Sequence, residues 1–143
     1  MTKIRKESRA MDSGWALEVM HKAPYITVSF IDHDGHPYGL PLSLASDDDA
    51  NWYFHGALEG KKLEAIKAHP EVCLSAVTRC APTVGPKDGS FTLQYKSAVA
   101  FGRAEMVTND PKAFRGADKP AFVVSSSQVR DISGHMSEDG QLR

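Results

Sequence analysis

The pattern of apolar and polar positions predicts an amphipathic helix near the start of the chain. Apolar residues recur at a spacing of four within residues 15–20, and Asp12 and Ser13 just before them are good N-cap residues. Proline cannot continue a helix, so Pro24 should end this one near Lys22.

The positions that follow indicate strands, beginning with a hairpin. Residues 25–31 and 38–44 have strand-like composition, and Asp34 and Gly35 between them adopt positive φ at low cost. Further apolar runs bounded by turn residues predict four more strands, at 52–55, 71–78, 91–106 and 121–131. Near the middle of the fifth strand, Gly102 marks an expected bend or bulge.

A second helix is expected between the third and fourth strands, from about Gly60 to Ala68. Its apolar face comprises Leu63 and Ile66, and Pro70 closes it. Six strands at short spacing with two short helices predict a mainly β (α+β) fold, a small closed barrel with helical caps.

Length and composition fit one globular domain. The chain of 143 residues suffices for one hydrophobic core, so we expect a single domain over residues 1–143 with loose tails at 1–11 and 135–143. With 41% hydrophobic residues, 24% charged residues and a net charge of −1, the chain has no bulk field that attracts nucleic acid or an acidic membrane.

The start of the chain and its cysteines favour the cytoplasm. Residues 1–11 are charged and lack the apolar core of a secretory signal. The longest strongly apolar run, residues 25–31, is far shorter than the roughly twenty residues that span a bilayer. Cys73 and Cys80 are the two cysteines, and in a chain without an export signal they are expected to stay reduced.

The segment WYFHGALEGKKLEAI, residues 52–66, is the strongest candidate for chemistry. The first N–H groups of a helix lack partners and carry partial positive charge, so a phosphate at residues 60–62 would meet backbone donors and two ammonium groups. Lys61 and Lys62 otherwise oppose the helix dipole, although Glu59 offsets part of that conflict. A solvated helix face explains the same lysines, and the residues alone leave the two interpretations open.

Three separated motifs occur in an order that resembles a known family. GHPYGLPLSL is followed by WYFHGALEGKKLEAIKAHPEVCLSAV and then by YKSAVAFGRAEMV, between about residues 25 and 107. In this order they resemble the 5-nitroimidazole resistance (Nim) branch of the pyridoxamine 5′-phosphate oxidase-like flavoproteins. The resemblance implies an FMN-binding split β-barrel.

The resemblance also implies a cofactor site at the interface of a homodimer. In the family, basic residues at the start of the helix after the third strand hold the flavin phosphate, and here these are Lys61 and Lys62. The second strand and the end of the third line the flavin ring and ribityl chain, which corresponds here to Pro41, Leu42, Ser43, Phe54, His55, Gly56 and Ala57. Lys96 and Ser97 lie where relatives place a contact to FMN from the opposite subunit.

One part of the chain departs from the family pattern. Relatives insert a helix before the last strand, whereas about a dozen residues separate Thr108 from Ala121 here. The segment VRDISGH, residues 129–135, resembles the closing strand of the family. The lid over the pocket is therefore not predicted by the resemblance.

His55 is the candidate proton donor. A histidine at a strand end often only hydrogen bonds a backbone group, and the residues alone favour that role. Beside the flavin that the resemblance implies, an imidazole titrating near neutral pH can protonate or position a substrate. His33 and His36 fit a hairpin tip, and we expect no metal because no second ligand cluster accompanies them.

The leading functional hypothesis is an FMN-dependent oxidoreductase. It would take electrons from NAD(P)H or another donor and reduce a small electrophilic substrate such as a nitro compound. Pyridoxamine phosphate oxidation fits less well, because the C-terminal end lacks an Arg-rich clamp for the substrate phosphate. Two alternatives stay open: a non-catalytic barrel that holds flavin or haem for storage or sensing, and an interaction module without a cofactor.

Overall fold

The computed structural model describes residue 5 and residues 7–46, 51–55, 60–84, 91–108, 121–124 and 131–136. Within these residues the chain forms a short 3₁₀ helix, two α-helices and nine strands. In chain order they are η1 (Glu7–Arg9), β1 (Ala10–Met11), α1 (Ser13–Lys22), β2 (Ile26–Ile31), β3 (Pro37–Leu42), β4 (Ala45–Ser46), β5 (Trp52–His55), α2 (Lys61–Ala68), β6 (Glu71–Val84), β7 (Phe91–Thr108), β8 (Ala121–Val124) and β9 (Asp131–Met136).

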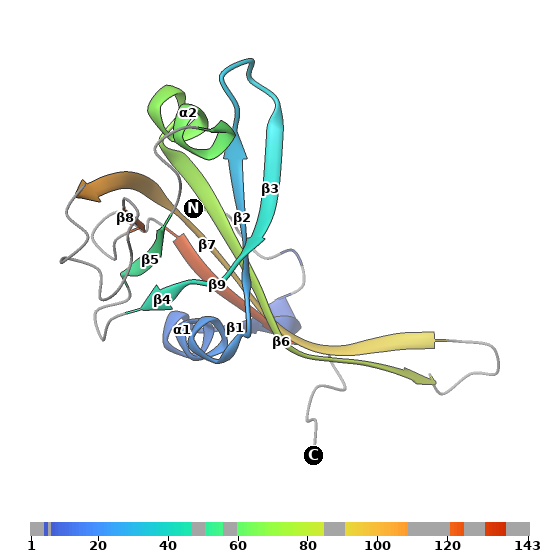
Figure 1. The fold of residues 1–143 in the computed structure, drawn as a ribbon. Helices are drawn as coiled ribbons and strands as arrows, with labels where there is room; N and C mark the ends of the chain where they lie inside the picture. Colours follow the sequence, from blue (N-terminus) through green and yellow to red (C-terminus); the bar gives the residue numbers. More distant parts are fainter. Residues whose placement is uncertain are drawn as a thin grey trace.

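The nine strands form one curled sheet in which every pairing is antiparallel. Neighbouring strands follow the order β3-β2-β6-β7-β8-β5-β4, and β9 pairs with both β7 and β1. Strand β7 joins the two parts of the sheet, because residues 96–101 pair with β9 and residues 104–108 pair with β8. Helix α1 lies at one end of the curled sheet and α2 at the other (Figure 1).

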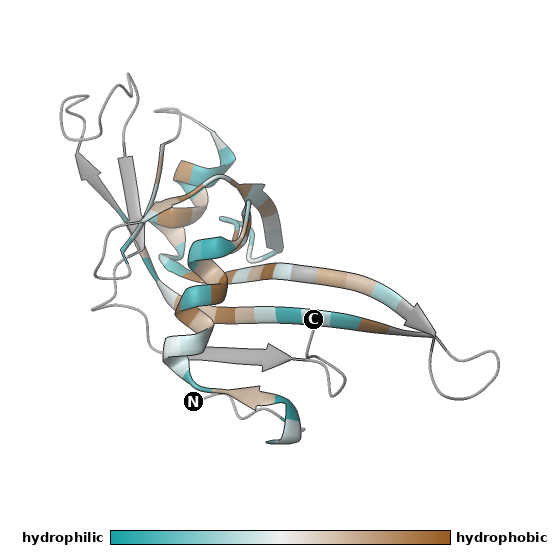
Figure 2. Cartoon of the chain, turned by 90° about the horizontal axis from the view of Figure 1, so that it is seen from below, coloured by the Kyte–Doolittle hydropathy of each residue, from teal (hydrophilic) through white to brown (hydrophobic). Residues whose placement is uncertain are grey.

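The core is built from alternate strand residues and one face of each helix. Buried residues of β2 and β6 include Ile26, Val28, Phe30, Val72, Leu74 and Ala76. The helices contribute Ala16, Val19, Met20, Leu63, Ala65 and Ile66. Helix α1 accordingly shows polar and apolar bands side by side (Figure 2), and burying each large apolar side chain stabilises the fold by about 1.5–3 kcal/mol.

Both helices begin and end close to the predicted residues. The carboxylate of Asp12 caps α1, which ends at Lys22 as the position of Pro24 predicts. Helix α2 starts at Lys61 with Gly60 as its N-cap and ends at Ala68. Among the described residues, no helix is long and apolar enough to cross a membrane.

The predicted mainly β split-barrel class is confirmed, but the strand count differs from the predicted six. Strands β1 and β4 have two residues each, too few to show a period of two in the sequence. The predicted strand at 121–131 is two strands, β8 and β9. The expected loose tails are wrong at their inner ends, because Ala10 pairs with His135 and Met11 pairs with Gly134.

Of the bend or bulge predicted at Gly102, the bulge is absent from the pairing of β6 with β7, whereas around this residue β7 passes from β9 (residues 96–101) to β8 (residues 104–108). Gly102 pairs with Val72 in uninterrupted register, and the shift in the β6–β7 pairing lies between Val77 and Arg79. Strand β6 then continues past its predicted end to Val84, so the far ends of β6 and β7 project as a two-stranded arm (Figure 1). Pro82 is tolerated there because this part of β6 pairs with β7 alone among the described strands.

Candidate functional site

The first turn of α2 is the predicted anion site, and the structure leaves its backbone donors uncapped. Gly60 adopts a φ of 127°, which favours glycine, and makes no side-chain cap hydrogen bond. The first bond inside the helix runs from the N–H of Glu64 to the carbonyl of Gly60, at 3.1 Å. The N–H groups of residues 61–63 therefore have no capping side chain among the described residues.

The two lysines of this turn have different surroundings. The Nζ of Lys61 lies 3.9 Å from an oxygen of Asp32 and 4.5 Å from the ring centroid of Tyr38. Lys62 is half-buried and makes no ion pair within the described part of the chain. A bound anion would thus meet one ammonium group that is already paired and one that is available.

Asp32 holds Lys61 from the turn between β2 and β3. Its side chain is 8% exposed, and its Oδ1 accepts hydrogen bonds from the N–H groups of Asp34 (3.0 Å) and His36 (2.8 Å). The bond from His36, followed by that from Asp34 and the charges of His36 and Lys61, lowers the pKa of Asp32 despite the opposing effect of burial. The carboxylate is therefore ionised beside Lys61 at neutral pH.

The same turn brings together side chains that resemble a metal site. Ligand atoms of Asp32, Asp34 and His36 lie within 4.8 Å of one another. The buried member, Asp32, already accepts two turn hydrogen bonds with one oxygen and directs the other towards Lys61. His33 pairs with Asp34 at 3.4 Å. Hydrogen bonds and ion pairs account for this turn, and we assign no metal to it.

The described residues among those predicted to line the flavin ring lie on β3, directly after it and on β5. Pro41 and Ser43 are exposed, whereas the side chain of Leu42 packs against the core and Phe54 is 2% exposed within it. Leu42 pairs with Ile26 of β2 and Phe54 with Phe122 of β8, so these two residues hold their strands in place. His55 ends β5 and pairs with Ala121. The predicted residues Gly56 and Ala57 lie outside the described residues.

Lys96 and Ser97 lie on opposite faces of β7. Side chains alternate along a strand, and Ala98 and Ala100 are fully buried, so Lys96 lies on the core side. Ser97 lies on the outer face together with Phe101, which is 36% exposed. Only one of the two can contact a flavin placed on a given face of the sheet.

Ser97 is also distant from the start of α2. Phe101, four residues after Ser97 on β7, pairs with Cys73 of β6, and Cys73 pairs with Ser29 of β2. Phe101 and Ser29 therefore lie at the same level of the sheet. Asp32 lies three residues beyond Ser29, beside Lys61. Seven strand residues span roughly 23 Å, so Ser97 cannot reach a phosphate held at Lys61 of the same chain.

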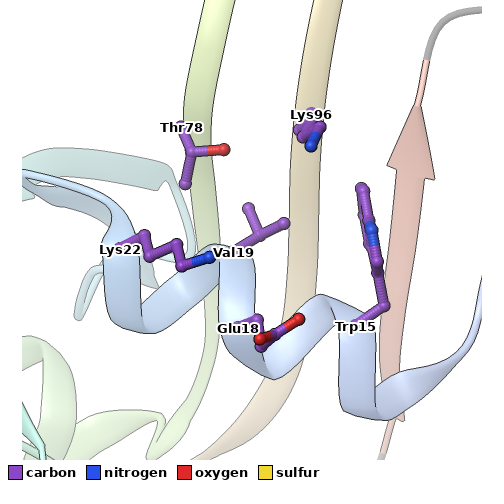
Figure 3. Close-up of a pocket in the computed structure, with 6 residues that line it drawn as sticks. All are labelled: Trp15, Glu18, Val19, Lys22, Thr78 and Lys96. Carbon is purple, nitrogen blue, oxygen red and sulfur yellow. The ribbon is translucent and has the colours of Figure 1, made fainter. Parts of the chain in front are cut away.

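Two of the cavities beside the sheet are lined by described residues. One encloses about 320 Å³ between α1 and the β6–β7 hairpin and is lined by Trp15, Glu18, Val19, Lys22, Thr78 and Lys96 (Figure 3). The other, about 290 Å³, is an apolar hollow on the outer face of β2, β6 and β7, where Ile31, Cys73 and Phe101 meet. Burial raises the pKa of the Cys73 thiol there.

Comparison with known proteins shows the family of the chain. The family model described as pyridoxamine 5′-phosphate oxidase matches residues 12–131, most of the sequence. The chain belongs to this family. A search of curated proteins found none that matches the sequence of this chain.

Solved structures share the fold of this pyridoxamine 5′-phosphate oxidase family member. A proposed 5-nitroimidazole antibiotic resistance protein from Bacteroides thetaiotaomicron is 18% identical, with a TM-score of 0.69 over 87% of this chain and 84% of that one. The FAD and haem binding protein from Mycobacterium smegmatis is 18% identical, with a TM-score of 0.74 over 92% and 74%. The flavocytochrome Anf3 from Azotobacter vinelandii is 17% identical, with a TM-score of 0.75 over 94% and 72%.

Asp32 is the site residue that the sequence analysis missed. The turn at residues 32–37 (DHDGHP) was expected from Asp34 and Gly35. An aspartate at the start of such a turn, here Asp32, is a signal for an Asx turn, in which its side chain accepts the N–H two residues later. Its contact with Lys61 joins residues 29 positions apart, as their numbers show. No local pattern reports such a pairing.

Proposed function

We propose that this family member is a homodimeric, FMN-dependent oxidoreductase of the cytoplasm that passes electrons from NAD(P)H to a small electrophile such as a nitro compound. The observation that carries the proposal is the uncapped start of α2, where free backbone donors and two lysines converge. A helix start of this kind suits a phosphate group and is otherwise unfavourable for the helix itself.

The residues at the start of α2 fit the phosphate of FMN. The N–H groups of residues 61–63 have no capping side chain in the described structure, and Lys62 adds an ammonium group without an ion pair. Charge-assisted hydrogen bonds of this kind contribute about 1.5–3 kcal/mol each. Lys62 is therefore the principal anchor in the proposal, and Lys61 contributes less while Asp32 holds it.

The flavin ring would lie along β3 and β5. Pro41 and Ser43 offer exposed groups, Leu42 and Phe54 anchor the strands through their pairing and burial, and Gly56 and Ala57 continue the wall as the resemblance implies. Bound flavin supplies the hydride or electron chemistry that no amino-acid side chain provides. His55, at the end of β5, would deliver the proton that the reduced substrate needs.

A second copy of the chain completes the proposed site. Ser97 lies on the outer face, too far from Lys61 of its own chain to share one ligand with it, so its contact to FMN requires a partner subunit. The same face exposes Ile31 (40%) and Phe101 (36%) at the apolar hollow and Val77 (45%) beside Ser97, which suits burial against another copy. Lys96, on the other face, has no role in this flavin site.

The test of cofactor binding uses matched lysine variants. We expect the wild-type protein to bind about one FMN per protomer, and Lys61→Ala combined with Lys62→Ala to abolish binding in a fluorescence titration. Lys67→Ala, at the exposed far end of the same helix, is the control and should bind normally. Unchanged FMN affinity in the double variant would disprove the anchor.

The test of dimerisation uses the outer face. Phe101→Glu places a charge in the proposed contact and should convert the protein from dimer to monomer in sedimentation velocity. Lys67→Glu places a charge on the surface of α2 and should leave the dimer intact. A wild-type protein that sediments as a monomer at every concentration would remove the partner subunit from the proposal.

Turnover separates the enzyme from a flavin or haem carrier. The similar structures include proteins described as binding haem, which keeps a cofactor-binding function without catalysis as the second candidate. An enzyme should oxidise NAD(P)H in the presence of a nitroaromatic acceptor, and His55→Gln should lower the rate and change its pH profile. A flavin-loaded protein without turnover would support the carrier instead.

A further inference from the structure

We propose that the cavity between α1 and the β6–β7 hairpin is a second small-molecule site, which binds a planar organic monoanion such as an aromatic carboxylate. The site is separate from the start of α2, because the two helices lie at opposite ends of the curled sheet (Figure 1). Its volume of about 320 Å³ is large enough for a small ligand.

The cavity exists because the sheet pairing shifts beside α1. The register of β6 against β7 jumps between Val77 and Arg79, which leaves Thr78 without a paired residue and turns it to the cavity. Below this point Ala76 and Ala98 are small and fully packed, at 1% and 0% exposure. The core therefore closes beneath the cavity and forms its floor.

The charges around the cavity favour an anion. Lys22 comes from the last turn of α1 and Lys96 from β7, and neither makes an ion pair within the described residues. Glu18 lies one helical turn before Lys22 and is likewise unpaired in the described part of the chain. Among the described side chains that line the cavity, two ammonium groups against one carboxylate leave a net charge of +1, which matches a monoanion.

The remaining wall favours a planar ligand. The indole of Trp15 stands at one side of the cavity, next to β9, and Val19 adds an aliphatic surface beside it (Figure 3). The hydroxyl of Thr78 faces the same space from β6 and can donate or accept one hydrogen bond (Figure 3). An aromatic ring can stack on the indole while its carboxylate meets the two lysines.

Calorimetric titration with benzoate and benzamide tests the charge requirement, because the two ligands share a planar ring and differ in charge. We expect benzoate to bind and benzamide to bind at least roughly tenfold more weakly. Lys22→Met and Lys96→Met keep the side-chain stems and should each weaken benzoate roughly threefold to tenfold. Lys67→Met, a matched surface lysine on α2, should have no effect.

Tryptophan fluorescence locates the bound ligand. The chain has two tryptophans, and Trp52 is 2% exposed within the core, so a benzoate-dependent change should come from Trp15. Trp15→Phe keeps an aromatic wall and should retain binding in calorimetry while losing the fluorescence change. A benzoate-dependent signal that survives Trp15→Phe would place the ligand elsewhere and overturn the proposal.

Saturation with FMN distinguishes this site from the proposed flavin site. We expect the same benzoate affinity with and without FMN, since the cavity lies far from α2 of its own chain and on the face of β7 opposite Ser97. Displacement of FMN by benzoate would assign the ligand to the flavin site and overturn the inference. Equal affinities for benzoate and benzamide, or no binding of either compound, would also overturn it. Protein that binds benzoate but no FMN would reject the proposed function and leave this second site standing.

Discussion

Helix α1 begins with Asp12, whose carboxylate accepts the N–H of Trp15 at 2.8 Å, whereas α2 begins with Gly60, which has no side chain to offer. The first turn of α1 carries no basic residue that opposes the helix dipole, and its last turn holds His21 and Lys22. Helix α2 instead places Lys61 and Lys62 at its positive end.

The difference supports the proposed anion site at the start of α2 rather than one at the start of α1. An N-cap such as Asp12 stabilises a helix by about 1 kcal/mol, and lysines in a first turn do the opposite. A helix start that omits the cap and adds cations is poorly built for its own stability. An external anion would supply the missing acceptor and add to the single negative charge of Glu64 in the same turn.

The largest expected effect comes from removing the available lysine of α2. Lys62→Ala should weaken FMN binding by roughly tenfold to hundredfold, because it removes a charge-assisted contact. Lys61→Ala should cost less, because Asp32 and Tyr38 already engage that ammonium group. Fluorescence titration measures both. Equal losses in the two variants would contradict the difference that the ion pair implies.

Removing the cap of α1 should give the converse result. Asp12→Ala should lower the free energy of unfolding by about 1 kcal/mol, as measured by urea denaturation, because the N–H of Trp15 loses its acceptor. FMN affinity should not change, since this helix start takes no part in the proposed cofactor site. A large loss of FMN affinity in Asp12→Ala would erase the contrast between the two helices.

Freeing Lys61 from its partner should sharpen the contrast. Asp32→Asn keeps the Oδ1 acceptor of the turn and removes the charge that faces Lys61, so FMN should bind roughly threefold to tenfold more tightly. Riboflavin has no phosphate and should bind both proteins alike. Asp34→Asn is the matched control, because Asp34 is exposed and makes no described contact with Lys61. Tighter riboflavin binding would point to a change in the pocket itself.

The smallest effect concerns stability in acid. The pKa of Asp32 is lowered in the folded protein, chiefly by the N–H of His36, so its contribution to stability is complete above the ordinary value of 3.8. That contribution is lost as the pH falls through the lowered pKa. Urea unfolding of wild type and Asp32→Asn between about pH 2 and 6 should show a steeper acid decline in the wild type. Parallel curves would refute the assignment.

Local patterns predicted the elements that have local causes. Asp12 and Pro24 set the ends of α1, and Asp34 with Gly35 fixed the hairpin between β2 and β3. Two-residue strands such as β1 depend on a distant partner, as the pairing of Met11 with Gly134, 123 positions away, shows. Such pairings leave no periodic trace in the sequence.

The site was predictable where a motif carries its own chemistry. Lys61 and Lys62 at a glycine-led helix start could be read from the sequence, and so could the position of His55 at a strand end. The different surroundings of Lys61 and Lys62 could not be predicted from the sequence, because Asp32 approaches Lys61 only through the packing of the hairpin against α2. Lys96 and Ser97 were placed together in the sequence and are separated in space by strand alternation.

Amide chemical shifts compare the two helix starts most directly. Adding FMN to isotope-labelled protein should shift the N–H resonances of residues 61–63 and leave those of residues 13–15 in place, because the start of α2 has no capping side chain, whereas the carboxylate of Asp12 already occupies the start of α1. Unmoved resonances at residues 61–63 in a protein that binds FMN would contradict the claim that α2 holds the phosphate.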